Sequence, residues 1–400
     1  MTTTPPVVRL KKRKALPVWA GHPWIYSGAV AGVSGEAPPG SLVLVQDDGA
    51  TPIGWGHLSP SGPITVRMLS LGAERPSEVG LLTARIDGAI ARRRAVGLPT
   101  PTTDAFRLVH GEGDLLPGLV IDHLGDGVVI QLGTAAWARL ADDVVRLLRE
   151  RLKPAWGVVQ VSPDAAAIEG LVARSEVAFG DEALAGSATV SEDGVRIAID
   201  VLGGQKTGFY ADQRETRRRV AELAGGRHVL DAFCHSGGFG LHALARGSAA
   251  SVTFVDTSPR AIALVERGLA LNGLSAEAVT ADAMTYLKDA AAAPRHDLIV
   301  LDPPKLARSR AHLDDALRKY QRINEAALSA LARDGLLVTC SCSGHVGMEE
   351  LLRVLSAAAF STRKHVHVIE ERGQAPDHPF LAACPEGRYL KCVIAHVTDR

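Results

Sequence analysis

The sequence predicts an α/β fold in its C-terminal half, preceded by a small β-rich region and a central α+β region. The predicted strands of the C-terminal half lie near residues 229, 252, 277, 298 and 336, with a closing pair near 363–371 and 387–397. They alternate with helical patterns, as in a parallel sheet with crossover helices. Residues 1 to about 75 contain short strands separated by Gly and Pro instead, which is typical of a small β-barrel.

Composition shifts divide the chain into three predicted domains, which cover residues 1–76, 77–195 and 196–400. The central domain opens with an arginine-rich helical pattern at 78–98. Strands then alternate with one helix, expected at 136–152. No internal repeat or low-complexity linker separates the domains.

Composition also limits the class of protein. A chain of 400 residues with 46% hydrophobic content can bury two or three cores. It contains no run of about twenty apolar residues and no apolar signal-peptide core, so we expect a cytosolic protein with no membrane contact. Its five cysteines are too few and too irregular for a disulfide scaffold. The formal net charge is zero, so any RNA affinity must come from local basic surface.

Two predicted strands end in reactive side chains. The apolar run in DLIVLDPPKLARS ends at Asp302, and the run in LLVTCSCSG ends at Cys340 and Cys342. Parallel strands bring such groups to one edge of a sheet. An acid-Pro-Pro turn can press against a planar base, and a thiolate can add to an electron-poor ring carbon, so the pair predicts nucleobase chemistry. A small buried apolar residue is the alternative for either cysteine.

A second motif predicts a cofactor site. HVLDAFCHSGGFGLHALARG contains a strand, a turn with Gly237, Gly238 and Gly240, and a helix, so the backbone can approach a ligand closely. The turn lacks the full G-x-G-x-x-G spacing, which counts against a dinucleotide. Asp256 ends the next strand and suits ribose hydroxyls, while Asp282 near the third strand end suits an adenine amino group. Helix N-capping is the alternative for both aspartates.

These motifs resemble those of RlmI-type class I S-adenosylmethionine-dependent rRNA (cytosine-C5) methyltransferases. The resemblance covers nearly the whole chain, through HPWIYSGAV, FRLVHGEGDLLPGLVID, GGQKTGFYADQRETR, LDPPK, TCSCS, DHPF and PEGRYLK. It implies an N-terminal PUA-like RNA-binding domain and a C-terminal Rossmann-like methyltransferase domain. The implied cofactor is S-adenosylmethionine and the implied partner is large-subunit (23S) ribosomal RNA. A homodimer remains open.

The resemblance also implies which residues form the site. The expected cofactor residues are Asp231, Phe233, Ser236, Gly237, Gly238, Asp256, Thr257, Asp282, Ala283, Asp302 and Gln213. The segment that leads into the domain is implied to line the cofactor and base pocket, through Gln205, Lys206, Phe209, Tyr210, Asp212 and Gln213. A buried turn of purely structural value is the alternative for this segment.

Two basic clusters could contact phosphate. The first, in an N-terminal arm without acidic neighbours, contains Arg9, Lys11, Lys12, Arg13 and Lys14. The second, on a helical segment, contains Arg214, Arg217, Arg218 and Arg219. In the second cluster, Glu215 and Glu222 can pair with the arginines, so a solvated charged face is the alternative. Four side chains that look exposed could stack on bases or pack in the barrel core: His22, Trp24, Tyr26 and Trp55.

Cytosine C5 is a poor nucleophile, so a thiolate should first add to C6. We expect Cys342 in this role, because its S-C-S placement resembles the S-C-N turn of related enzymes, with Cys340 second. Asp302 would hold the base edge, Lys305 or His345 could favour the thiolate, and the base that removes the C5 proton is unassigned. No metal is expected, since the C-x-C spacing lacks a clear fourth zinc ligand.

Two other functions remain open. A base-nitrogen RNA methyltransferase could use the Asp302 turn to bind an exocyclic amine, and it would need no thiol. A non-catalytic PUA-type ribosome assembly factor would bind RNA without turnover. The set of Asp256, Asp282 and Asp302 argues against the second of these.

Overall fold

The structure is a computed structural model that describes residues 5–59, 61–204, 206–307 and 310–400. The chain forms two compact units. The first comprises 1–188, 200–209 and 376–387, and the second comprises 189–199, 210–375 and 388–400. In the part of the chain that the structure describes, no helix is both long and apolar enough to cross a bilayer.

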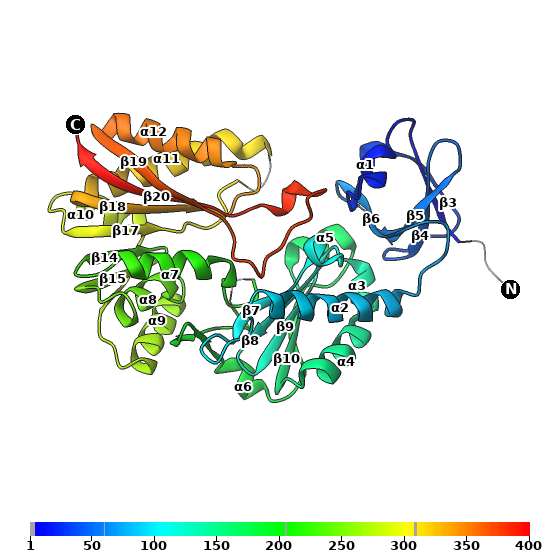
Figure 1. The fold of residues 1–400 in the computed structure, drawn as a ribbon, viewed down its shortest axis with the longest axis horizontal. Helices are drawn as coiled ribbons and strands as arrows, with labels where there is room; N and C mark the ends of the chain where they lie inside the picture. The colour runs from blue at the N-terminus through cyan, green and yellow to red at the C-terminus, as the bar shows by residue number, and fades with distance from the viewer. Residues whose placement is uncertain (1–4, 60, 205, 308–309) are drawn as a thin grey trace. The chain divides into compact units, whose positions relative to one another are not determined.

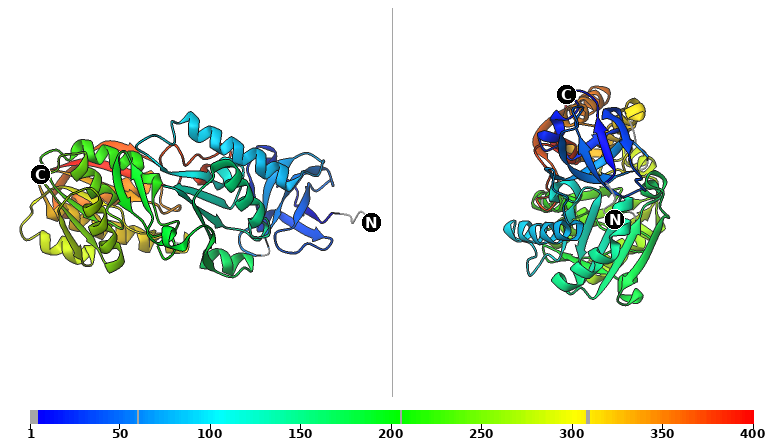
Figure 2. Two further views of the ribbon diagram at one scale, coloured as in Figure 1. Left: turned by 90° about the horizontal axis from the view of Figure 1, so that it is seen from below. Right: turned by 90° about the vertical axis from the view of Figure 1, so that its right-hand side faces the viewer.

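The first unit begins with a curled six-stranded sheet in the order β2-β6-β5-β4-β1-β3, seen from two sides in Figure 2. Its strands are β1 (Val7–Leu10), β2 (Trp24–Tyr26), β3 (Val30–Ser34), β4 (Leu42–Gln46), β5 (Pro52–Leu58) and β6 (Ile64–Leu71), with the short helix α1 (Leu16–Trp19) between β1 and β2. Apolar side chains such as Val8, Val43 and Val66 fill its core. The small β-domain predicted from the Gly and Pro spacing is confirmed.

A five-stranded sheet in the order β11-β10-β9-β8-β7 follows α2 (Glu78–Ala95). Its strands are β7 (Ala105–His110), β8 (Leu119–Leu124), β9 (Gly127–Leu132), β10 (Trp156–Val161) and β11 (Arg174–Phe179). The accompanying helices are α3 (Ala135–Arg139), α4 (Ala141–Leu152), α5 (Pro163–Glu169) and α6 (Glu182–Gly186). The single helix expected at 136–152 is wrong in one respect, because Leu140 leaves helical geometry and divides it into α3 and α4.

The second unit opens with the hairpin β12 (Thr189–Glu192) and β13 (Val195–Ala198) and contains a seven-stranded sheet in the order β16-β15-β14-β17-β18-β20-β19. The sheet strands are β14 (His228–Ala232), β15 (Ser251–Asp256), β16 (Glu277–Thr280), β17 (His296–Leu301), β18 (Leu331–Ser341), β19 (Lys364–Arg372) and β20 (Lys391–Asp399). The first five of these run parallel, and β20 pairs antiparallel with β18 and β19. The predicted strand sequence and closing pair are confirmed.

Helices cover both faces of this sheet. Figure 1 shows α7 (Arg214–Leu223), α8 (Gly238–Ala245) and α9 (Pro259–Leu271) together on one face, and α11 (Leu313–Ala330) with α12 (Met348–Thr362) on the other. Helix α10 (Ala283–Ala290) packs against α11. Because β14, β15, β17 and β18 are parallel neighbours, the loops that follow them meet at one edge of the sheet.

Candidate active site

A strained turn connects β14 to α8. Phe233, His235 and Gly237 have φ values of 61°, 49° and 75°, in the left-handed region. Residues other than glycine rarely adopt this backbone conformation, and those that do are often found at ligand-binding turns. Gly240 allows α8 to pack on β15, since a Cβ there would lie 2.2 Å from Cε1 of Phe254.

Asp231 lies beneath this turn. Its Oδ2 accepts a hydrogen bond from the Gly240 amide at 2.9 Å. Its Oδ1 is buried and has no hydrogen-bond partner among the described residues. Burial raises the pKa of Asp231 to about 8. A buried carboxyl with an unsatisfied oxygen beside a strained glycine turn fits a ligand that carries an amino group, as S-adenosylmethionine does.

The two aspartates at the next strand ends differ in their local roles. Asp256 accepts the amides of His235 and Ser258 at 3.0 and 2.9 Å, so it holds the glycine turn. Ser258 itself caps α9, so the alternative that Asp256 is that cap is wrong. Asp282 does cap α10, accepting the Thr285 amide at 2.9 Å.

The remaining expected cofactor residues lie on the same edge of the sheet. Phe233 is half-buried and Ser236 is buried in the glycine turn, whereas Thr257 is exposed after β15 and Ala283 is buried at the start of α10. The structure thus brings most of the set to the loops that follow β14, β15 and β16. Whether these residues bind a cofactor stays a prediction.

The predicted catalytic groups meet after β17 and β18. Gln213 Nε2 donates to Asp302 Oδ2 at 3.1 Å, which joins the segment before α7 to the acid-Pro-Pro turn. Cys340 is fully buried opposite Cys392 in the neighbouring strand, and the Cys392 thiol and burial raise its pKa well above the ordinary range. Cys342 is only partly buried, while the other four cysteines are buried. Cys342 is therefore the thiol that a nucleobase could reach.

Hydrogen bonds fix the turn that carries Cys342. The Ser341 hydroxyl donates to Tyr320 Oη at 3.0 Å, and Tyr320 Oη lies 3.2 Å from Ser343 Oγ. Ser343 Oγ also accepts the Ala307 amide at 3.2 Å, which ties this turn to the loop after β17. The thiol therefore lies between two serines held by a buried tyrosine.

Lys391 is a basic residue at this site that the sequence analysis did not select. Its ammonium donates to the carbonyl oxygens of Ser343 and Tyr389 at 2.7 and 2.6 Å. Burial lowers the pKa of Lys391 to about 8. The two basic groups expected from the sequence, Lys305 and His345, are both exposed. The only signal for Lys391 was its place in the PEGRYLK motif.

The GQKTGFYADQR segment divides between the two units. In the second unit, the Tyr210 ring packs edge-on against His235 with 5.0 Å between ring centroids, and burial raises the pKa of Tyr210. Asp212 accepts a hydrogen bond from the Tyr389 hydroxyl at 2.6 Å. In the first unit, Lys206 is exposed and Phe209 is buried. Gln205 lies outside the described residues.

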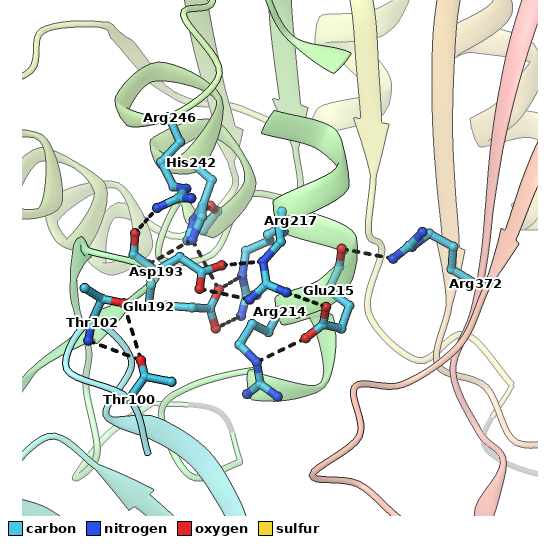
Figure 3. Close-up of polar contacts among 12 residues, drawn as sticks. Thr100, Thr102, Glu192, Asp193, Arg214, Glu215, Arg217, His242, Arg246 and Arg372 are labelled. Carbon is cyan, nitrogen blue, oxygen red and sulfur yellow. Dashed lines mark hydrogen bonds and ion pairs between the residues drawn. The ribbon is translucent and has the colours of Figure 1, made fainter. Parts of the chain in front are cut away.

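The predicted basic face on α7 is instead largely paired with acids. Arg217 donates to both carboxylate oxygens of Glu192 at 2.6 and 2.7 Å, and both side chains are buried (Figure 3). Arg218 pairs with Asp193 and Glu215, and Arg219 with Glu222 and Glu370. Arg214 is buried, which argues against a phosphate contact by this residue. The hairpin β12–β13 supplies acids that the spacing within α7 could not reveal.

The N-terminal arm differs from α7. Its basic residues, Arg9 and Lys11 to Lys14, are all exposed, and Lys11 donates to the carbonyl oxygen of Gly28 at 3.0 Å. Among the aromatic residues, Tyr26 is 42% exposed. Trp55 is buried and donates to the Ala73 carbonyl oxygen at 3.1 Å, so for this residue the structure supports the packing alternative and not base stacking.

One group of potential metal ligands occurs among the described residues. The ligand atoms of His22, Cys384 and Glu386 lie within 4.8 Å of one another. His22 Nδ1 lies 3.1 Å from the Trp24 amide, and Nε2 lies 3.4 Å from Glu386. A neutral imidazole that accepts at Nδ1 and donates at Nε2 accounts for both contacts without a metal ion.

Comparisons with known proteins agree with this geometry. A family model described as a PUA-like domain matches residues 8–71, and one described as an S-adenosylmethionine-dependent methyltransferase matches residues 129–387. A ribosomal RNA large subunit methyltransferase of Deinococcus radiodurans is 39% identical over 397 residues, 96% of each chain. A ribosomal RNA large subunit methyltransferase I of Alteromonas mediterranea is 34% identical over 94% of this chain and 95% of its own.

Two solved structures share the fold. A putative S-adenosylmethionine-dependent methyltransferase from Streptococcus mutans has a TM-score of 0.82 at 19% identity and covers 98% of this chain and 99% of its own. The putative methyltransferase SMU.776, solved in complex with SAH, has a TM-score of 0.83 with the same identity and coverage. At this identity the likeness concerns the fold alone.

Proposed function

The chain belongs to the S-adenosylmethionine-dependent methyltransferase family, and on that premise we propose that it methylates C5 of a cytosine in large-subunit (23S) ribosomal RNA through a covalent bond between Cys342 and C6. The names of its relatives supply the RNA class. The observation that supports the C5 chemistry is the accessibility of Cys342, which directly follows β18. The other four cysteines are buried. We further propose an RNA-binding domain at 1–76, a central domain at 77–195 and the methyltransferase domain at 196–400.

The cofactor supplies an electrophilic methyl group when it is bound. Asp231 would face its amino group and Asp256 its ribose, while Gly237 and Gly238 would let the backbone approach it. Asp256 also accepts the His235 amide, so it would both bind the ribose of the cofactor and hold the glycine turn in position.

The reaction then follows from the residues at the strand ends. The Cys342 thiolate adds to C6, and the electron pair displaced onto the ring makes C5 nucleophilic. Asp302, held by Gln213, would bond the protonated N3 of the base. After the methyl group is attached, a base removes the C5 proton, the C6–S bond breaks, and the thiolate is regenerated.

Asp231→Asn tests two properties of this residue: its raised pKa, through the pH dependence of stability, and its role in cofactor binding. An unfolded Asp loses its proton near pH 4, but the folded carboxyl keeps it until about pH 8. The free energy of unfolding should therefore fall as pH rises between these values, and the variant should lack this loss. Thermal unfolding should show the variant gaining stability over wild type from pH 5 to pH 8, while calorimetry shows weaker S-adenosylmethionine binding. A constant stability difference across that range would contradict the raised pKa, and an unchanged affinity for S-adenosylmethionine would contradict the cofactor assignment.

Replacing Lys11, Lys12, Arg13 and Lys14 with Ala tests RNA binding by the first domain. The slope of log affinity against log salt should flatten by up to about 0.9 for each phosphate that the arm neutralises in wild type. Arg146→Ala is the control, because this exposed arginine pairs with Asp143 and Glu150. It should leave the slope nearly unchanged. An equal effect of the two variants would show that the arm does not bind phosphate specifically.

The product identifies the modified atom. Large-subunit RNA from a strain that lacks the gene should be methylated in vitro, digested to nucleosides and analysed by mass spectrometry. We expect 5-methylcytidine. A methyl group on a ring or exocyclic nitrogen would overturn the C5 assignment.

A further inference from the structure

Lys391 contacts the chain on both sides of Cys342. Within the antiparallel pair of β18 and β20, it lies directly opposite Ser341. Its ammonium reaches past that residue and donates to the carbonyl oxygen of Ser343 at 2.7 Å. The residues before and after the thiol are thus both neighbours of one lysine.

The cation and the thiol are also held against relative movement. Tyr320 bonds the Ser341 hydroxyl and lies within hydrogen-bond distance of the Ser343 hydroxyl, so it fixes the turn from the side of α11. Lys391 is anchored by the Tyr389 carbonyl oxygen as well. These two bonds use two of the three ammonium donors. One N–H remains for a group in the turn.

We propose that Lys391 is the positioning residue that activates the nucleophile: its ammonium stabilises the thiolate form of Cys342. This inference rests on the proposed function and names how its nucleophile is generated. A cation within about 4–6 Å of an acid favours the ionised form, and a free thiol is otherwise only a few per cent thiolate at neutral pH.

Other groups around the pair have smaller or indirect roles. Glu350 and Lys305 act electrostatically on Lys391, as does Cys342 itself. Tyr210 and Tyr320 lie near Cys342, and burial raises the pKa of both, so they stay neutral at physiological pH. Because burial lowers the pKa of Lys391 to about 8, the ammonium is present at pH 7 and its effect declines above pH 8.

The test is the rate at which iodoacetamide alkylates Cys342 in the full-length protein without RNA, followed over pH 5.5 to 10 by mass spectrometry of the modified peptide. Lys391→Met removes the charge and keeps the apolar stem. We expect the midpoint of its rate–pH profile to rise by about one unit or more and its rate at pH 7 to fall about tenfold. Lys319→Met, which removes an exposed lysine next to Tyr320 on α11, should leave the midpoint unchanged.

A second variant separates charge from hydrogen bonding. Lys391→Gln keeps two N–H donors without the charge, so it should show the same rise in midpoint. Cofactor affinity verifies that each variant is folded. An unchanged midpoint in either folded Lys391 variant, or an equal rise in Lys319→Met, overturns the proposal. Alkylation of Cys342 requires no methyl transfer, so this test does not depend on the proposed function. The proposed function would be overturned by a different result, namely methylation activity retained in Cys342→Ser.

Discussion

Cys342→Ser should lower RNA methylation by about a thousandfold or more, because a serine hydroxyl is not appreciably ionised at neutral pH and cannot form the adduct. The affinities for S-adenosylmethionine and RNA should remain nearly intact, since the adduct is needed only after both have bound. Single-turnover methylation with labelled cofactor measures the first effect, and calorimetry measures the second.

Cys340→Ser is the matched control for this result. Cys340 lies in the same strand but is buried, and its raised pKa opposes thiolate formation. We expect a milder loss from this variant. Full activity of both single variants and of the double variant would contradict C5 chemistry and favour methylation at a nitrogen atom.

Glu192→Gln should destabilise the second unit by about 3–5 kcal/mol, because it leaves the buried Arg217 guanidinium without its anion. Arg217 also packs against the start of α8, where a Cβ at Gly238 would lie 2.8 Å from its Cδ. The substitution should therefore weaken cofactor binding too. Hydrogen exchange in β14 is the suitable probe, since all five tryptophans lie in the first unit and their fluorescence would not report on the second.

Glu222→Gln is the control for the ion pair. Glu222 pairs with Arg219 on the same helix, but both side chains are substantially exposed. Such pairs contribute about 0–1 kcal/mol, so exchange in β14 should hardly change. A comparably small effect of Glu192→Gln would show that the buried pair does not stabilise the unit.

The sequence was sufficient to locate the strands of the second unit along the chain, because many of them are apolar runs bounded by turns, such as the one ending at Asp302. It was also sufficient to place Cys342 and Asp302 at one edge, which follows from parallel strands. Local capping was harder. Ser258 rather than Asp256 caps α9, and the two are too close in sequence for spacing to decide.

Pairing between distant segments accounts for most of the remaining differences. The face of α7 that carries the arginines was interpreted as a free basic surface. Its acidic partners Glu192 and Asp193 belong to a hairpin about 25 residues earlier in the chain. Lys391 was missed because 48 residues separate it from Ser343, which it bonds. No local pattern encodes either interaction.

The most direct test of the central claim uses large-subunit RNA that carries 5-fluorocytosine, incubated with the protein and S-adenosylmethionine and analysed on a denaturing gel. Fluorine at C5 cannot leave as a proton would, so the bond between Cys342 and C6 should persist. We expect a covalent protein–RNA complex with wild type, its loss in Cys342→Ser, and its retention in Cys340→Ser. No complex with wild type, or one that persists in Cys342→Ser, would contradict nucleophilic catalysis by Cys342.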